Sequence, residues 1–157
     1  MSDAKYRDST LSGIGAYLFG GRWNTPEHYA VYLSGTLTLA MLEVLVHVDD
    51  AEAFAQKAHV YHAVRFDEKD VAVLGEDSLP QTWNARPETL ASQTIGDEFL
   101  ERGGGVALAL PSVVVPRALR YDPLYMNYLV NPKHPDFGAA AEVGEVQPLD
   151  WDPRLAP

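Results

Sequence analysis

The chain of 157 residues contains no cysteine, so disulfide bonds, a cysteine nucleophile and cysteine-ligated metal sites are all excluded. Basic residues are also scarce, because 12 lysines and arginines stand against 22 aspartates and glutamates, for a net charge of -10. A nucleic-acid backbone is bound through a basic surface, so this balance argues against direct nucleic-acid binding. A small phosphorylated ligand remains compatible with it, since two local arginines are enough to bind one.

Long apolar segments are absent as well. The most apolar stretch, residues 37–48, is too short to cross a bilayer and contains Glu43 and His47. Residues 1–5 lack the apolar core of a signal peptide. We therefore expect a cytoplasmic protein with no membrane partner. The length and the share of apolar residues, 46%, predict one globular domain over residues 1–157.

Helical and strand patterns are mixed along the chain without regular βαβ alternation. This order predicts an α+β fold, a single compact domain with a mainly antiparallel sheet core and flanking helices. Thr36 is expected to cap the first helix, and the glycines at 103–105 to end the second. The predicted helices are 37–47 and 89–102; the predicted strands are 29–33, 60–66, 71–74, 106–110, 113–115, one near Tyr128 and an edge strand within 142–152; 8–28 and 79–87 are expected to be loops.

Glu43 is unusual because it lies within an apolar helix. Nine of the twelve residues from 37 to 48 are apolar, which predicts a helix buried on most of its circumference. A carboxylate in such a place must be paired, hydrogen-bonded or protonated. The residues alone leave two interpretations, a satisfied structural charge and a functional carboxylate.

Arg22 follows two glycines in the segment 20–24, which reads Gly-Gly-Arg-Trp-Asn. Glycines let a backbone bend closely around a ligand, and a guanidinium presents a fixed fork of donors to phosphate or carboxylate. Arg7 lies just before a segment rich in serine and threonine. Two arginines on either side of a glycine-rich loop would suit a diphosphate. The alternative for each is a surface ion pair.

Three other chemistries have little support in the residues. The glycines between positions 13 and 21 lack the spacing of the dinucleotide fingerprint, which argues against a Rossmann site. His59 and His62 would face opposite sides of a strand and have no clear third ligand, so we expect no metal. Ser112 follows a proline without the glycine elbow of a serine hydrolase, and its alternative role is a turn residue.

Short motifs occur along the chain in this order: Tyr6-Arg7, 20–24, 30–33, 39–47, Leu79-Pro80 with Trp83, 95–100, 111–116, 127–135 and 152–155. Taken in this order, they resemble the RES domain, a family named for its Arg, Glu and Ser. The resemblance covers nearly the whole chain and rests on the number and order of the motifs. Phe99 stands where the family commonly has Trp, and residues 117–126 form a longer link than usual before the motif that contains Asn131 and His134.

Members of this family are toxins of bacterial toxin–antitoxin pairs. The resemblance implies a fold similar to ADP-ribosyltransferases, with NAD bound as a substrate in a central cleft. It implies cleavage of the bond between nicotinamide and ribose, which depletes NAD by hydrolysis or phosphorolysis. The alternative is transfer of ADP-ribose to a host protein such as a phosphoribosyl pyrophosphate synthetase. A cognate antitoxin that occludes the cleft is the expected partner.

The residues and the resemblance together predict the site. Glu43, Arg22 and Tyr32 are expected to be catalytic, and Arg7, Arg22, Tyr32 and Ser112 are expected to bind NAD. Glu43 would stabilise the positive charge that develops on the ribose, or orient the nucleophile. The arginines would bind the diphosphate, Tyr32 would stack on nicotinamide or hydrogen-bond the ribose, and Ser112 would hydrogen-bond the substrate or an arginine. A non-catalytic binding module is the third hypothesis, without positive support.

Overall fold

A computed structural model describes residues 1–48, 50, 53–54 and 56–155. Its largest sheet has four strands in the order β2–β7–β6–β5. The pairs β2–β7 and β7–β6 are antiparallel, and β6–β5 is parallel. The bounds of these strands are β2 (Val31–Ser34), β5 (Val71–Val73), β6 (Ala107–Pro111) and β7 (Met126–Val130).

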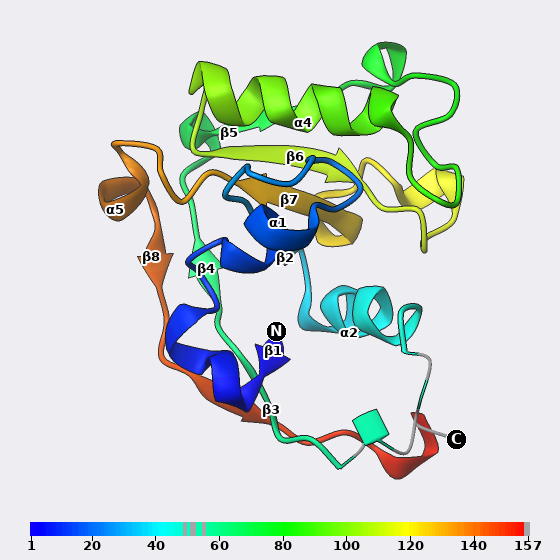
Figure 1. Ribbon diagram of the computed structural model, residues 1–157, viewed down its shortest axis with the longest axis vertical. Coiled ribbons are helices and arrows are strands. Elements are labelled where there is room, and N and C mark those ends of the chain that lie inside the picture. Colours follow the sequence, from blue (N-terminus) through cyan, green and yellow to red (C-terminus); the bar gives the residue numbers. More distant parts are fainter. Residues whose placement is uncertain (49, 51–52, 55, 156–157) are drawn as a thin grey trace.

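Two smaller antiparallel sheets complete the strand pairing of the described residues. One has the order β1–β3–β9, and the other pairs β4 with β8. Figure 1 shows the four-stranded sheet at one end of the molecule and the β1–β3–β9 sheet at the other, with helix α2 between them. The predicted α+β fold with a mainly antiparallel core is confirmed. The bounds are β1 (Ser2–Asp3), β3 (His59–Tyr61), β4 (Val64–Arg65), β8 (Glu142–Val143) and β9 (Gln147–Leu149).

The helices begin and end where the local sequence supplies caps. α2 starts after Thr36, whose hydroxyl accepts from the amide of Leu39 at 3.2 Å. α4 ends at Gly103, which adopts the left-handed conformation that glycine tolerates best. The helices are α1 (Ile14–Phe19), α2 (Leu37–Leu45), α4 (Leu90–Arg102) and α5 (Phe137–Ala140); the 3-10 turns are η1 (Ala4–Ser9), η2 (Glu68–Asp70), η3 (Glu76–Ser78), η4 (Arg117–Leu119), η5 (Pro123–Tyr125) and η6 (Pro153–Leu155).

Both faces of the four-stranded sheet are covered, so all five residues of β6 are buried. On one face, Leu108, Leu110 and Leu129 pack with Trp23 and Trp83 under side chains of α4. On the other face, a second cluster packs against Leu11, Phe66 and side chains of α5. The second cluster consists of Val31, Val106, Ala107 and Val130. This two-sided packing fixes the strands whose ends carry the site described below.

Three predicted elements differ from the structure. The segment 8–28, expected to be a loop, contains the short helix α1. The alternating stretch 60–66 is divided into β3 and β4, because these strands pair with different partners, β1 and β9 for the first and β8 for the second. Residues 113–115 form bends instead of a strand, although their β-branched side chains favour extended structure.

The expectation that α2 is buried on most of its circumference is wrong. Leu39 is the buried residue of this helix, whereas Leu42 and Val46, at its end, are 44% and 46% exposed. The reason is that part of the apolar surface faces a cavity instead of a packed core: Ala40, Val44 and Val46 line it. Among the described residues, no helix is both long and apolar enough to span a bilayer.

Candidate functional site

A cavity of about 680 Å³ lies beside α2 and the ends of β2, β6 and β7. Its lining includes three of the predicted site residues, Glu43, Arg22 and Tyr32, which are far apart in the sequence. Arg86 and Glu88, from the loop before α4, also line it. A cavity of this size with a few converging polar groups is typical of a small-molecule site.

Glu43 is held at the cavity by two side chains from neighbouring strands. The hydroxyl of Ser112, just after β6, donates to Glu43 Oε1 at 2.6 Å. The side-chain amide of Asn127, in β7, donates to the same oxygen. Glu43 Oε2 has no hydrogen-bond partner within the part of the chain that is described. One carboxylate oxygen is therefore fixed by the protein, and the other is available to a ligand.

The orientation of the Asn127 amide is itself determined by a third strand. Ser34, at the end of β2, donates from its hydroxyl to Asn127 Oδ1 at 2.7 Å. Asn127 Oδ1 is thus occupied, which directs the NH₂ group toward Glu43. Ser112 Oγ also accepts from the amide of Val114 at 3.1 Å, so its proton is left for Glu43. This chain of hydrogen bonds supports the carboxylate in the way that preorganised sites require.

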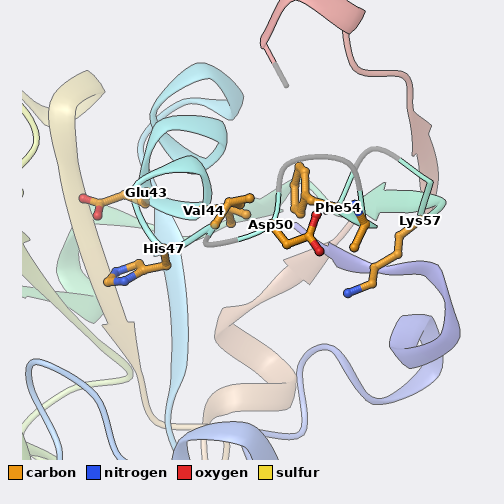
Figure 2. Close-up of a pocket in the computed structure, with 8 residues that line it drawn as sticks. Glu43, Val44, His47, Asp50, Phe54 and Lys57 are labelled. Atoms are coloured by element: carbon orange, nitrogen blue, oxygen red, sulfur yellow. Dashed lines mark hydrogen bonds between the residues drawn. The ribbon is translucent and has the colours of Figure 1, made fainter. Parts of the chain in front are cut away.

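The side chains of α2 divide between two directions. Figure 2 shows Glu43 and His47 projecting to one side of the helix, while Val44 extends toward Phe54 on the other side. A second hollow of about 380 Å³ lies on that other side and reaches Lys57. Glu43, Val44 and His47 line both hollows, so this turn of α2 forms the wall between them.

Tyr32 hydrogen-bonds the turn formed by residues 20–24. Its hydroxyl donates to Asn24 Oδ1 at 2.7 Å and accepts from the amide of Trp23 at 3.1 Å. A Cβ atom at Gly21 would lie 2.7 Å from this hydroxyl, so the turn needs glycine at that position. Burial of the hydroxyl raises the pKa of Tyr32, which keeps it protonated. The hydroxyl is thus occupied within the protein, and the ring is what Tyr32 presents to the cavity.

Arg22 lies at the same turn and reaches across to the loop before α4. Its Nη1 donates to the carbonyl oxygens of Trp83 at 3.0 Å and Ala85 at 2.9 Å. The segment 20–24 is also tied to α4, because Gln93 Nε2 donates to the carbonyl of Gly21 at 3.1 Å. The turn and the loop form one connected wall of the cavity.

The structure does not bring Arg7 to the other predicted residues. It lies in η1, its side chain is 62% exposed, and its Nε contacts Asp8 Oδ1 at 3.3 Å. It is not among the residues that line the cavity. Its role in binding NAD stays a prediction. Ser112 is 1% exposed and hydrogen-bonds Glu43 and the amide of Val114. Glu43 was predicted as a site residue, but its contact with Ser112 was not.

Four polar residues that line the cavity, Ser34, Asn127, Arg86 and Glu88, were not predicted as site residues. Asn127 begins one of the motifs, but its contacts with Glu43 and Ser34 depend on strand register. Arg86 and Glu88 follow the motif Leu79-Pro80 with Trp83 but lie outside it. Asn131 and His134, later in the motif that Asn127 begins, have structural contacts: Asn131 Nδ2 donates to Leu100 O at 2.9 Å, and His134 Nε2 lies 3.2 Å from Gly103 O.

The histidines considered for a metal do not form a ligand cluster. His59 is buried in β3, and His62 follows that strand. Among the described residues, no group of three or more His, Asp or Glu side chains is placed to hold a metal ion. The charged groups around the cavity instead suit an organic ligand that carries both anionic and polar parts.

Comparison with known proteins agrees with the sequence motifs. The family model described as "RES domain" matches residues 1–152. A "Toxin Res" of Yersinia enterocolitica is 34% identical over 153 residues, which cover 96% of this chain and 93% of that protein. A "Toxin Res" of Photorhabdus laumondii is 36% identical over 157 residues, covering 99% and 94%. A "Prs ADP-ribosylating toxin" of Sphingobium is 32% identical over 158 residues, covering 98% and 92%.

A solved structure also matches, the toxin–antitoxin complex MbcT–MbcA of M. tuberculosis. The TM-score is 0.69 at 19% identity, over 92% of this chain and 78% of that one. At this identity the similarity concerns the fold. The predicted membership of a toxin family is confirmed by the family model and by the relatives together. The chain belongs to the RES-domain family.

Proposed function

We propose that this protein is the toxin of a toxin–antitoxin pair and that it cleaves the nicotinamide–ribose bond of NAD in the cavity beside α2. Depletion of NAD by hydrolysis or phosphorolysis would then arrest growth. The observation that carries the proposal is the arrangement of Glu43, held by Ser112 and Asn127 with one oxygen left for a ligand. NAD is consumed as a substrate, no metal is needed, and the protein acts in the cytoplasm.

Cleavage of the nicotinamide–ribose bond requires a negative charge near the ribose more than it requires a general acid. Nicotinamide leaves as a neutral molecule, and the ribose becomes an oxocarbenium-like cation in the transition state, as in glycoside cleavage. A carboxylate that is already oriented stabilises this charge without reorganisation. Glu43 fits this role because its position is fixed before substrate arrives. The ring of Tyr32 supplies a surface on which nicotinamide can stack.

A second activity is favoured by one comparison. The Sphingobium relative is named for ADP-ribosylation of Prs, and it matches 98% of this chain. Cleavage of the same bond serves both reactions, and the acceptor decides between them. Transfer to a host protein, such as a phosphoribosyl pyrophosphate synthetase, is therefore the alternative function. The antitoxin is proposed to bind over the cavity, and the solved relative in a toxin–antitoxin complex supports a partner of this kind.

The deciding experiment uses NAD labelled in its adenine half, incubated with the purified protein in phosphate buffer, alone and with cell lysate. Free ADP-ribose, or its phosphorylated form, without labelled protein identifies NAD depletion. A discrete labelled band in lysate identifies protein modification, and mass spectrometry names the target. If neither tube consumes NAD in the absence of antitoxin, the proposal is wrong and a binding module remains.

Glu43→Gln tests the residue that carries the proposal. The glutamine keeps an Oε1 acceptor for Ser112 and Asn127, so the fold is retained while the charge is removed. We expect turnover to fall by about 100-fold or more, as for loss of one preorganised electrostatic contact. The matched control is Glu142→Gln, whose carboxylate is 73% exposed and paired with Arg65 outside the cavity. Wild-type turnover in Glu43→Gln would rule out the assigned role.

A further inference from the structure

The loop between β5 and α4 brings a second arginine to the cavity. Arg86 lines the cavity together with Arg22, and these two are the arginines among its described lining residues. Arg86 lies in the segment 79–87, which was predicted to be a loop. The sequence predicted that Arg7 binds a diphosphate together with Arg22. Because Arg7 lies away from the cavity, Arg86 is the arginine that could bind the diphosphate there.

The two arginines of the cavity differ in what they contact. Arg22 Nη1 is engaged by the backbone carbonyls of Trp83 and Ala85. Arg86 has no carboxylate within 4.0 Å and no side-chain hydrogen bond in the part of the chain that is described. Elsewhere, exposed arginines are paired with acids; these are Arg7, Arg65, Arg102, Arg117 and Arg154. An unpaired guanidinium is notable in a chain with a net charge of -10.

Arg22 fixes the backbone on which Arg86 is placed. The carbonyls that it binds belong to Ala85, next to Arg86, and to Trp83. Trp83 is buried, stacks on Trp23 at 6.0 Å between ring centroids, and has the Arg120 guanidinium 5.2 Å from its ring. The loop is therefore attached at several points next to Arg86, and Arg86 itself is exposed.

We propose that Arg86 is the residue that binds the diphosphate of NAD, and that Arg22 is a positioning residue that holds the Arg86 loop against the cavity. This inference rests on the proposed function, because it requires NAD in the cavity. A guanidinium binds phosphate oxygens through two parallel charge-assisted hydrogen bonds, and an unpaired one loses no ion pair when it does so. Arg22 contributes by keeping that guanidinium within reach of the ligand.

The first test compares wild type with Arg86→Ala. The affinity for ADP, which carries the diphosphate and has no bond to cleave, is measured by calorimetry, and the kinetics of NAD consumption are measured in parallel. We expect Arg86→Ala to weaken ADP binding by about 10- to 100-fold, and to raise KM for NAD more than it lowers kcat. Arg86→Lys should recover part of the ADP affinity, since a point charge remains.

The control is Arg102→Ala, which removes an exposed arginine paired with Glu98 on α4, away from the cavity. It should leave ADP affinity and NAD kinetics unchanged. ADP affinity within twofold of wild type in Arg86→Ala would overturn the assignment. So would a loss of kcat and thermal stability without a change in ADP affinity. If wild type binds ADP through Arg86 but consumes no NAD, the proposed function fails while the anion site stands.

A double-mutant cycle tests the positioning role of Arg22. If Arg22 acts through the Arg86 loop, Arg86→Ala loses its large effect once Arg22→Ala is present. We expect Arg86→Ala to change ADP affinity less than about threefold in the Arg22→Ala background. Equal effects in both backgrounds would mean that the arginines act independently, which would overturn the positioning role.

Discussion

The two ends of the molecule are stabilised in different ways (Figure 1). The end with the four-stranded sheet and α4 contains both clusters of buried hydrophobic residues. At the other end, Val60 of β3 is a buried hydrophobic residue. The rings of Phe54, His59 and Trp151 pack together beside the β1–β3–β9 sheet, with centroids 4.4 to 5.7 Å apart. Buried nitrogens of His59, His62 and Trp151 lack hydrogen-bond partners within the described part.

This difference indicates where precise geometry is maintained. The groups that hold Glu43 and Arg22 come from strands and loops of the four-stranded end. Unsatisfied buried polar groups lower stability. In the described part, those of His59, His62 and Trp151 lie at the other end, whereas Arg120 Nε lies over Trp83 at the four-stranded end. We therefore expect the site to depend on the four-stranded sheet, and the β1–β3–β9 sheet to be the weaker part.

Truncation of the two cores should give the largest difference. Leu129 is fully buried between β2 and β6, so Leu129→Ala should lower the free energy of unfolding by about 2–5 kcal/mol. Val60→Ala at the other end should lower it by about 1–2 kcal/mol, since it removes less buried carbon. Urea denaturation measures both. A loss at Val60 as large as that at Leu129 would contradict the comparison.

A pair of glycines tests how tightly α4 packs at the four-stranded end. A Cβ at Gly96 would lie 1.6 Å from the carbonyl oxygen of Trp23, whereas nothing lies within 4 Å of one at Gly15. We expect Gly96→Ala to lower the free energy of unfolding by about 1–3 kcal/mol and to reduce NAD turnover, because Trp23 lines the cavity. Gly15→Ala, within α1, should raise stability by about 0.5–1 kcal/mol. Thermal melts that showed Gly96→Ala as stable as wild type would mean that this contact is loose.

Two histidines should give a smaller effect, with opposite signs at the two ends. Burial lowers the pKa of His59, so the unfolded chain binds this proton more tightly. The stability contribution of His59 is therefore present above about pH 6.5 and is lost as the pH falls below that value. His59→Phe should remove this loss, which for one group is less than about 1.4 kcal/mol per pH unit.

His28, at the four-stranded end, should show the reverse. Burial acts to lower its pKa, but the contacts with Glu101 at 3.0 Å and Asp97 at 3.3 Å outweigh burial and raise it. Its contribution is fully present below about pH 6.5 and is lost as the pH rises through its folded pKa. Chemical denaturation between pH 5 and 8 should therefore show His28→Asn and His59→Phe changing the pH profile in opposite directions. Profiles that change in the same direction would refute the assignment.

The sequence predicted the local structure best where caps and short-range patterns decide it. Thr36 and Gly103 mark the ends of helices in the positions expected. Strands β2, β5 and β6 lie within a residue or two of their predicted bounds, because continuous apolar or β-branched runs define them. A strand was expected near Tyr128 without bounds, and β7 contains that residue. The break between β3 and β4 was missed because it results from pairing with separate partner strands, which no local pattern records.

Three of the predicted site residues lie together in the structure, whereas the contacts around them were not predicted. Glu43, Arg22 and Tyr32 do line one cavity. The partners of Glu43 were not predictable, because they depend on the register of β2, β7 and β6, which places Ser34 beside Asn127. Arg86 was missed because its position depends on a loop tethered by a side chain 61 to 63 residues earlier. Non-local contacts of this kind leave little trace in one sequence.

The connections around Glu43 have a consequence for the timing of synthesis. Ser112 and Asn127 follow Glu43 by 69 and 84 residues, so the ribosome makes the acid long before the groups that orient it. A nascent chain that ends before β7 has the helix and the carboxylate but lacks the strand that completes their support. The hydrogen-bonded arrangement around Glu43 therefore forms only after Asn127 has been synthesised, and a producing cell does not encounter it earlier.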